Sequence, residues 1–176
     1  MKNIKKNISF IIYRMIAYYL PNSDIYFFGL ISKKIRGFLV KKIIVECGEN
    51  INIQNKAIFS TKIKLGNNSG IGKRCNISAY TSIGDDVMMG EDVIIYTRNH
   101  STYMTDIPMN KQGFKKFQDV IIGNDVWIGS RVIILPGVKI GNGVIIGAGS
   151  VVTKNVPDLV VVAGNPAKIV KKRTLQ

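Results

Sequence analysis

The sequence contains few of the residues that build metal sites or covalent cross-links. It has one histidine, two cysteines and one tryptophan in 176 residues. A single histidine excludes a catalytic zinc site of the three-histidine type, and two cysteines are too few for a disulfide-rich fold. We therefore expect no bound metal. We also expect both cysteines to be reduced, as is typical of the cytoplasm.

Acidic residues and long apolar runs are scarce as well. The chain has 25 Lys and Arg against 11 Asp and Glu, and Asp24 is the only acid among residues 1–42, which hold nine of the basic residues. Nucleic-acid binding is not expected, because no helix-turn-helix, zinc or aromatic RNA-binding pattern accompanies the charge. Arg14 interrupts the longest apolar stretch, so no spanning helix is predicted. The absence of a small-residue cleavage site after this stretch favours a cytoplasmic protein over an exported one.

Residues 1–42 predict two amphipathic helices, about Ile4 to Leu20 and Asp24 to Lys42, because Pro21-Asn22-Ser23 between them is typical of a helix stop and start. One side of the second helix combines Phe27, Phe28, Ile31, Ile35, Phe38 and Leu39, with basic residues around the rest. Two interpretations stay open. The helices cap the structure that follows or pack on a neighbouring subunit, or they attach peripherally to an anionic membrane surface.

A six-residue period governs the chain from about residue 47 onward. The first place of each unit is aliphatic in almost every case, the second is often glycine, and the fifth is small or β-branched. Three such units form one triangular turn of a parallel β-helix, in which the aliphatic residues fill the interior. Cys47 and Cys75 occupy places in this repeat where a small hydrophobic residue belongs, so we interpret them as packing residues.

The repeat predicts an all-β protein built around a β-helix of about five coils. Nine units precede a break and six follow it in a shifted frame. We divide the chain into an N-terminal amphipathic helical segment (1–45), a β-helix domain (46–160) and a C-terminal segment (161–176) that contains a short helix. The break predicts an external loop at 96–121, because insertions at a solenoid corner project outward.

His100 is the main candidate for catalysis. It stands at the start of the external loop, directly after a regular turn of the repeat, so the sheet should hold it while it faces outward. A lone histidine on a loop is more often an ordinary surface residue. Its place at the break of a regular solenoid favours a catalytic role, because an imidazole can accept a proton from a hydroxyl group at neutral pH.

The stretch from Ile122 to Pro157, closed by Ala163-Gly-Asn-Pro-Ala-Lys168, resembles the hexapeptide-repeat acyltransferases. This family includes maltose, galactoside, serine, antibiotic and polysaccharide acetyltransferases, and the resemblance covers about Ile63 to Lys172. It implies a left-handed β-helix and a homotrimer with active sites between subunits. It also implies acetyl-CoA as co-substrate and His100 as the general base.

The resemblance also implies which residues bind the substrates. Those of the coenzyme A groove would be Ser130, Ala148, Thr153, Lys154, Lys168 and Lys171. Ser130 and Ala148 are eighteen residues apart and should stack on consecutive turns, while Lys168 and Lys171 stand where the family has arginine. Trp127 would border the active site, and Asn76 and Tyr103 are weaker candidates on the acceptor side.

The sequence therefore predicts an acetyl-CoA-dependent O-acetyltransferase that moves acetyl directly to a hydroxyl of a sugar or polysaccharide precursor. Two enzymatic alternatives remain, an antibiotic O-acetyltransferase and an amino-sugar N-acetyltransferase. A purely structural or ice-binding solenoid is disfavoured, because the ordered threonine rows of such flat faces are absent. The acceptor depends on loop shape, which the spacing of the repeat does not encode.

Overall fold

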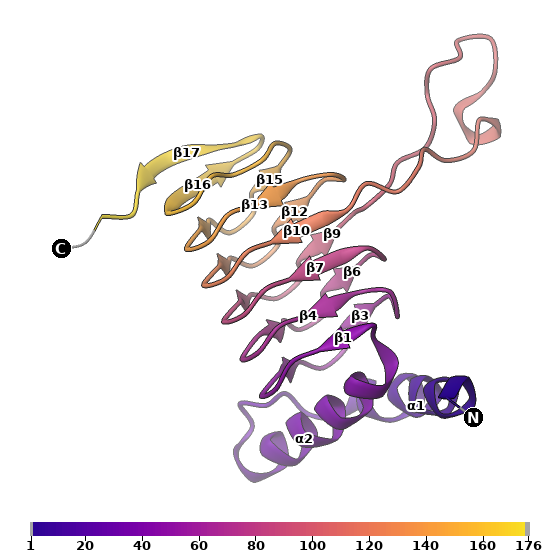
Figure 1. The fold of residues 1–176 in the computed structure, drawn as a ribbon, viewed down its shortest axis with the longest axis vertical. Coiled ribbons are helices and arrows are strands. Elements are labelled where there is room, and N and C mark those ends of the chain that lie inside the picture. The colour runs from indigo at the N-terminus through magenta and orange to yellow at the C-terminus, as the bar shows by residue number, and fades with distance from the viewer. Residues whose placement is uncertain (1, 175–176) are drawn as a thin grey trace.

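The six-residue repeat folds into a parallel β-helix with helices at its N-terminal end and one long arm projecting from its side (Figure 1). The computed structural model describes residues 2–174. Most strands have only two residues, the first facing outward and the second inward, as Trp127 and Ile128 do in β11. This alternation is the ordinary period of a strand, and it places one aliphatic residue from each repeat in the core.

Each face of the β-helix is a stack of parallel strands, one from each turn. The first face contains β1 (Glu46–Cys47), β4 (Lys64–Leu65), β7 (Thr81–Ile83), β10 (Val120–Ile122) and β13 (Lys139–Ile140). The second contains β2 (Asn52–Ile53), β5 (Gly70–Ile71), β8 (Met88–Met89), β11 (Trp127–Ile128), β14 (Ile145–Ile146) and β16 (Val160–Gly164). The third contains β3 (Ile58–Phe59), β6 (Asn76–Ile77), β9 (Ile94–Ile95), β12 (Ile133–Ile134) and β15 (Val151–Val152). The β-helix thus has five complete turns, as predicted, and β16 begins a sixth.

The strand register explains the two frames of the repeat. Leu65 pairs with Ile83, eighteen residues further on, whereas Ile83 pairs with Ile122, which is 39 residues further on. The extra residues between β9 and β10 leave the stack as the arm. The arm therefore interrupts the sequence period but not the spatial one.

A ladder of Asn and Asp side chains ties the turns together at the corner between the first and second faces. Each side-chain oxygen accepts a hydrogen bond from a backbone N–H of the preceding turn, at 2.6 to 2.9 Å. The acceptors are Asn67, Asp85, Asn124, Asn142 and Asp158. The ladder crosses the break without interruption, which shows again that the arm does not disturb the stack.

The N-terminal residues form α1 (Lys2–Met15), the 3-10 turn η1 (Ala17–Tyr19) and α2 (Tyr26–Ile43), which cover the first turn of the β-helix (Figure 1). Arg36 of α2 is fully buried at this junction. Its guanidinium donates hydrogen bonds to backbone carbonyls on both sides, those of Ala17, Leu20, Pro21 and Ile53. Burial lowers the pKa of Arg36, and the four carbonyls offset the loss of water around the charge.

The side of α2 that packs inward differs from the apolar side visible in the sequence. The buried residues of α2 are Gly29, Ser32, Arg36, Leu39, Val40 and Ile43. Gly29 is required because a Cβ there would lie 2.6 Å from the carbonyl oxygen of Asn22. Only Leu39 of the apolar set is buried, and the other five members are exposed. The sequence groups Arg36 with the basic residues around the rest of this helix, but in the structure Arg36 is buried.

The predicted short helix in the C-terminal segment is also wrong. Residues 167–172 form β17 (Ala167–Lys172), which pairs antiparallel with β16 through a turn at Asn165-Pro166, directly after Gly164 (φ 104°). The β-branched run Val160-Val161-Val162 extends the ladder of the second face, and the N–H of Gly147 donates to the carbonyl of Val162 at 2.8 Å. Residues 175–176 of this predicted segment lie outside the described residues.

Candidate active site

The arm is an ordered antiparallel stalk of residues 96–119 with a folded tip (Figure 1). Three backbone hydrogen bonds join its two limbs: Gln118 to Thr97 at 2.7 Å, Lys115 to Asn99 at 2.9 Å, and Ser101 to Gly113 at 3.0 Å. The predicted loop 96–121 is two residues too long, because residues 120 and 121 pair with β7 as part of β10. The arm is therefore attached to the stack at both ends by sheet pairing.

The tip of the arm, which includes the 3-10 turn η2 (Met109–Lys111), is closed by Gln112. The side-chain oxygen of Gln112 accepts from the N–H of Met104 at 3.1 Å. Its side-chain nitrogen donates to the carbonyls of Met104 at 2.8 Å and Ile107 at 2.7 Å. One side chain thus satisfies three backbone groups, which gives the tip a defined shape without a core of its own.

His100 lies on the stalk and is exposed on one side. It pairs across the stalk with Phe114, and the two ring centroids are 4.1 Å apart at an interplanar angle of 31°. The guanidinium of Arg98 lies 4.1 Å from the ring centre of Phe114 and 4.6 Å from that of Phe117. Phe117 in turn stacks on Tyr80 at 4.7 Å. The imidazole is therefore held against an aromatic and cationic stack that is anchored to the β-helix.

Phe114 and Phe117 were missed by sequence reasoning, although a signal for them exists. They are the two aromatic residues of the returning limb, and antiparallel pairing around a tip places one of them opposite His100. The register of that pairing follows from the stalk hydrogen bonds, which the repeat does not predict. Arg98 also lies beside His100, because both contact the ring of Phe114.

Three of the predicted coenzyme A residues follow one edge, the corner between the second and third faces. Ser130 and Ala148 occupy this corner on consecutive turns. A Cβ on Gly129 would lie 2.6 Å from the backbone nitrogen of Ala148, so the turns approach closely there. Lys168 lies close to the same edge, because it pairs with Ala163 near the C-terminal end of β16, where the strand approaches this corner.

The remaining candidates lie elsewhere on the chain. Thr153 and Lys154 follow β15 at the corner between the third and first faces, the corner from which the arm leaves. Lys171 pairs with Val161 on the second face. Trp127 lies on that face too and is 52% exposed. One chain therefore places Thr153 and Lys154 on the edge of the arm, and Ser130, Ala148 and Lys168 on another edge.

The two acceptor-side candidates are also separated from each other. Asn76 is exposed on β6 of the third face, two turns of the stack below β12. Tyr103 lies on the arm three residues beyond His100 and is 78% exposed. Within a single chain, neither residue has a hydrogen bond to His100 among the described residues. Within the same range, no three His, Cys, Asp or Glu side chains gather as a metal site would require.

The outer surfaces of the three faces differ in chemistry. Outward positions of the second face include Met88, Trp127, Ile145 and Val161, and those of the third include Ile94, Ile133 and Val151. The first face instead carries Glu46, Lys64, Ser82 and Lys139, with Ile121 as the apolar exception. Apolar columns on two faces are typical of surfaces that another chain covers.

Comparison with known proteins identifies the family of this chain. The family described as "Bacterial transferase hexapeptide (six repeats)" matches residues 119–154. Galactoside O-acetyltransferase of Escherichia coli strain K12 is 36% identical over 141 residues, which cover 78% of this chain and 68% of that protein. The crystal structure of a maltose O-acetyltransferase from Clostridium difficile 630 superposes with a TM-score of 0.75 and 31% identity, covering 99% of this chain and 89% of the other.

A galactoside acetyltransferase in complex with coenzyme A superposes equally well. Its TM-score is 0.75 at 28% identity, with 98% of this chain and 82% of that chain covered. The fold of stacked hexapeptide turns and these relatives define the class, an acyltransferase. The chain belongs to the hexapeptide-repeat acyltransferase family.

Proposed function

We propose that this protein transfers acetyl directly from acetyl-CoA to a hydroxyl of a sugar or polysaccharide precursor, with His100 as the general base. One observation carries the proposal. The only histidine is exposed on a structured arm, in a chain similar to galactoside and maltose O-acetyltransferases. The coenzyme A complex of a similar protein supports a CoA thioester as the acetyl donor.

The chemistry requires one base and one electrophile. The imidazole of His100 accepts the proton of the acceptor hydroxyl, while the oxygen of that hydroxyl attacks the thioester carbonyl. The new C–O bond forms, the C–S bond breaks, and coenzyme A leaves as a thiol once it has taken up the proton. A backbone N–H on the coil edge of residues 127–130 would stabilise the oxyanion of the intermediate.

We infer that the complete site lies between chains of a homotrimer. His100 and the edge with Ser130 and Ala148 are separated within one chain, so a neighbouring chain must bring an arm to that edge. The apolar outer columns of the second and third faces supply the surfaces for such packing, and the charged first face stays in solvent. Light scattering should give three times the chain mass of 19.5 kDa.

The edge of small residues suits a long pantetheine arm. Ser130 and Ala148 leave room beside the backbone, and backbone groups there can pair with the amides of pantetheine. The hydroxyl and phosphate groups of the nucleotide would be bound by Lys168 at the same edge. Around the interface between chains they would also be bound by Thr153, Lys154 and Lys171. Lysine acts as a point charge here, without the bidentate geometry of arginine.

The decisive experiment measures free thiol released from acetyl-CoA with a panel of acceptors. The panel contains simple sugars, nucleotide sugars, an amino sugar and a hydroxyl-bearing antibiotic. We expect release that depends on a sugar hydroxyl and that falls at least ~100-fold in His100→Ala, the scale of a general base. Lys111→Ala at the exposed tip of the same arm is the matched control and should retain activity.

Other outcomes would change the proposal in defined ways. Preference for the antibiotic or for the amino group would replace the sugar hydroxyl by one of the two alternatives. Full activity of His100→Ala would exclude its role as the base. If acetyl-CoA neither binds nor releases thiol with any acceptor, the transferase proposal is wrong.

A further inference from the structure

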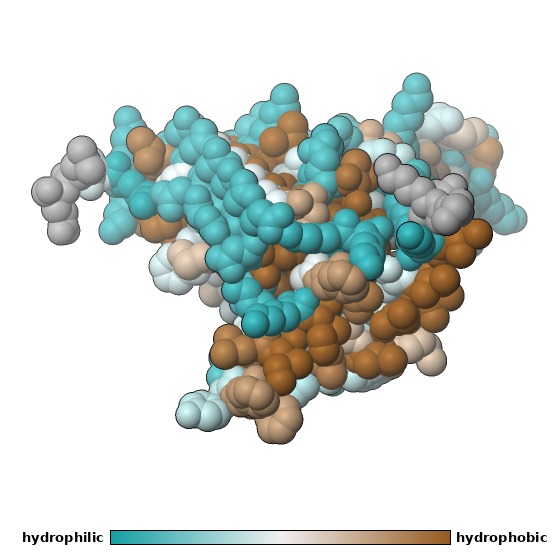
Figure 2. All heavy atoms as spheres, turned by 60° about the horizontal axis from the view of Figure 1, so that its bottom comes forward, coloured by the Kyte–Doolittle hydropathy of each residue, from teal (hydrophilic) through white to brown (hydrophobic). Residues whose placement is uncertain are grey.

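The helical end of the molecule exposes a large set of apolar side chains. Figure 2 shows brown residues gathered along the lower part of this end, beside a band of teal residues. The exposed apolar residues of this end, here called the helical-end surface, are Ile4, Ile8, Ile11, Ile12, Met15, Ile16, Tyr19, Ile25, Tyr26, Phe27, Phe28, Leu30, Ile31, Ile35 and Phe38. Single exposed apolar residues are ordinary, but a set of this size on two adjacent helices marks an interaction surface.

This surface is not needed to hold the helices on the β-helix. The opposite side of the helices does that, through Arg36 and its four carbonyl partners and through Tyr13. Tyr13 is buried and donates a hydrogen bond from its hydroxyl to the carbonyl of Ala57 at 2.9 Å. Substitutions on the helical-end surface therefore leave the packed side intact, which makes the surface testable without unfolding the chain.

Basic side chains border the apolar set. Residues 1–42 contain nine Lys and Arg and one acid, Asp24. On α2 the exposed amine of Lys34 has no acidic partner among the described residues, and the amine of Lys42 lies 3.7 Å from the ring centre of Phe38. The surface thus combines bulky apolar groups with uncompensated positive charge.

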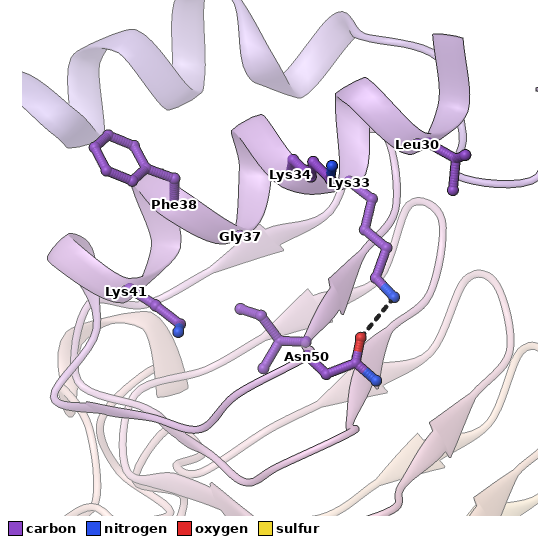
Figure 3. A pocket seen from close by; sticks show the side chains of 8 residues that line it. Leu30, Lys33, Lys34, Gly37, Phe38, Lys41 and Asn50 are labelled. Atoms are coloured by element: carbon purple, nitrogen blue, oxygen red, sulfur yellow. Dashed lines mark hydrogen bonds between the residues drawn. The ribbon is translucent and has the colours of Figure 1, made fainter. Parts of the chain in front are cut away.

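A hollow of about 440 Å³ at the same end repeats this combination. Figure 3 shows Lys33, Lys34 and Lys41 around it, with Leu30 and Phe38 at its rim. Lys33 donates to the neutral side chain of Asn50 at 3.0 Å, and Lys41 pairs with Glu49. Among residues 2–174, two of the three amines have no carboxylate partner, so the hollow fits an anionic group joined to an apolar one.

An exposed apolar surface could contact a second copy of this chain or a lipid bilayer, and the positive charge of this end favours one of the two. A second copy would bring the same basic end, or the rest of the chain, which is also net basic with 16 Lys and Arg against 10 acids. Like charges across such a contact oppose association. An anionic lipid bilayer complements both features, because its headgroups attract the lysines and its acyl boundary accepts the aromatic and aliphatic side chains.

We propose that the helical-end surface docks this protein on an anionic lipid bilayer, with α1 and α2 lying in the interface. No helix among residues 2–174 is long and apolar enough to cross a bilayer, so the contact is peripheral. The arrangement leaves the arm at the side of the β-helix, away from the end that would contact the bilayer (Figure 1). His100 lies on this arm. The inference does not depend on the acetyl transfer proposed above.

The test is cosedimentation of the full chain with vesicles. We expect binding to phosphatidylcholine vesicles that contain about one third phosphatidylglycerol, much weaker binding to pure phosphatidylcholine, and release at high salt. Lys33→Gln with Lys34→Gln should weaken binding about 25-fold, since each lysine near an anionic surface contributes roughly fivefold. Phe27→Ser with Phe28→Ser should weaken it at least ~10-fold.

Matched controls separate this surface from general charge and hydrophobicity. Lys115→Gln with Lys116→Gln removes two exposed lysines from the arm. Met109→Ser with Val170→Ser removes two apolar residues that are each 63% exposed, as Phe27 is. Both control pairs should bind vesicles as the unaltered chain does.

Three results would overturn the proposal. The first is no binding to the anionic vesicles at low salt. The second is binding that the helical-end substitutions and the controls weaken equally. The third is a fall in the oligomeric mass of Phe27→Ser with Phe28→Ser, because this would mean that another copy of the chain covers the surface.

Discussion

The stack of coils and the arm use their side chains in opposite ways. In the stack, almost every strand buries one aliphatic residue, and backbone N–H groups are satisfied by the next turn or by the Asn and Asp ladder. In the arm, 24 residues have two buried side chains, Thr97 and Ser101. The arm is held by stalk hydrogen bonds, by Gln112 at its tip and by the stack of Arg98, His100 and Phe114.

This difference shows how a repetitive fold can carry a candidate catalytic residue on an inserted segment. Each turn of the β-helix contributes the same kind of interior contacts. An insertion at one corner therefore removes few of the buried contacts of the core. The register between β7 and β10 and between β9 and β12 continues past the arm. Stability therefore resides in the stack, whereas the candidate base resides in a segment that the stack does not need.

Removing the arm is the strongest test of this separation. Thr97 and Gln118 are joined by a 2.7 Å hydrogen bond, so an Asn-Gly turn can replace residues 98–117. We expect acetyl transfer to fall by at least ~100-fold, because the proposed base is lost, while the thermal unfolding midpoint stays close to that of the full chain. Thiol release and circular dichroism measure the two quantities. A shortened chain that fails to fold would show that the arm supports the stack after all.

Truncating an inward residue tests the stack itself. Ile122 is 2% exposed and Ile121, its neighbour in β10, is 42% exposed. Ile122→Ala should lower the free energy of unfolding by about 2–5 kcal/mol, through lost burial and the cavity left behind. Ile121→Ala is the matched control and should cost less than about 1 kcal/mol. Denaturant titration compares them, and equal losses would mean that the outward position is also buried, by another chain.

The Asn and Asp ladder should make a smaller contribution. Asn124→Ala removes the acceptor that the N–H of Asp85 uses at 2.8 Å. Because the corner is exposed, water replaces part of the bond, and we expect a loss of about 0.5–1.5 kcal/mol in the free energy of unfolding. Asn110→Ala at the exposed tip of the arm should change it by less than about 0.5 kcal/mol. If the two substitutions were equivalent, the ladder would be a consequence of stacking and not a support for it.

Alkylation of the two cysteines is the prediction with the smallest expected effect. Burial raises the pKa of the Cys75 thiol from 9.0 to about 12, and burial also raises the pKa of the half-buried Cys47. An alkylating reagent at pH 8 should therefore label Cys47 first and Cys75 only on unfolding, as peptide mass analysis would reveal. A raised folded pKa means that the stability from burying the neutral Cys75 thiol is complete below about pH 9 and is lost between there and about pH 12. Rapid labelling of Cys75 in the folded protein would contradict its burial.

The sequence predicted the β-helix well, because the same six-residue pattern of aliphatic residues recurs along the chain. Ile53, Ile71 and Ile128 occupy the same place in the repeat, and each is fully buried. It predicted the C-terminal segment poorly, because the local pattern of residues 161–176 gives no sign that β16 will add to the second face. It also did not reveal the inner side of α2, because Arg36 has its hydrogen-bond partners only in the folded chain.

By itself, the sequence determined the β-helix, the number of its turns, the place of the arm and the one histidine available as a base. These follow from a period and from composition, which are local properties. The tertiary structure alone decided that Phe114 stacks on His100, that Arg36 is buried among carbonyls, and that Phe27 and Phe28 face outward. The physical reason is that a side chain's partners come from segments far apart in the chain, and only the folded arrangement brings their charges and surfaces together.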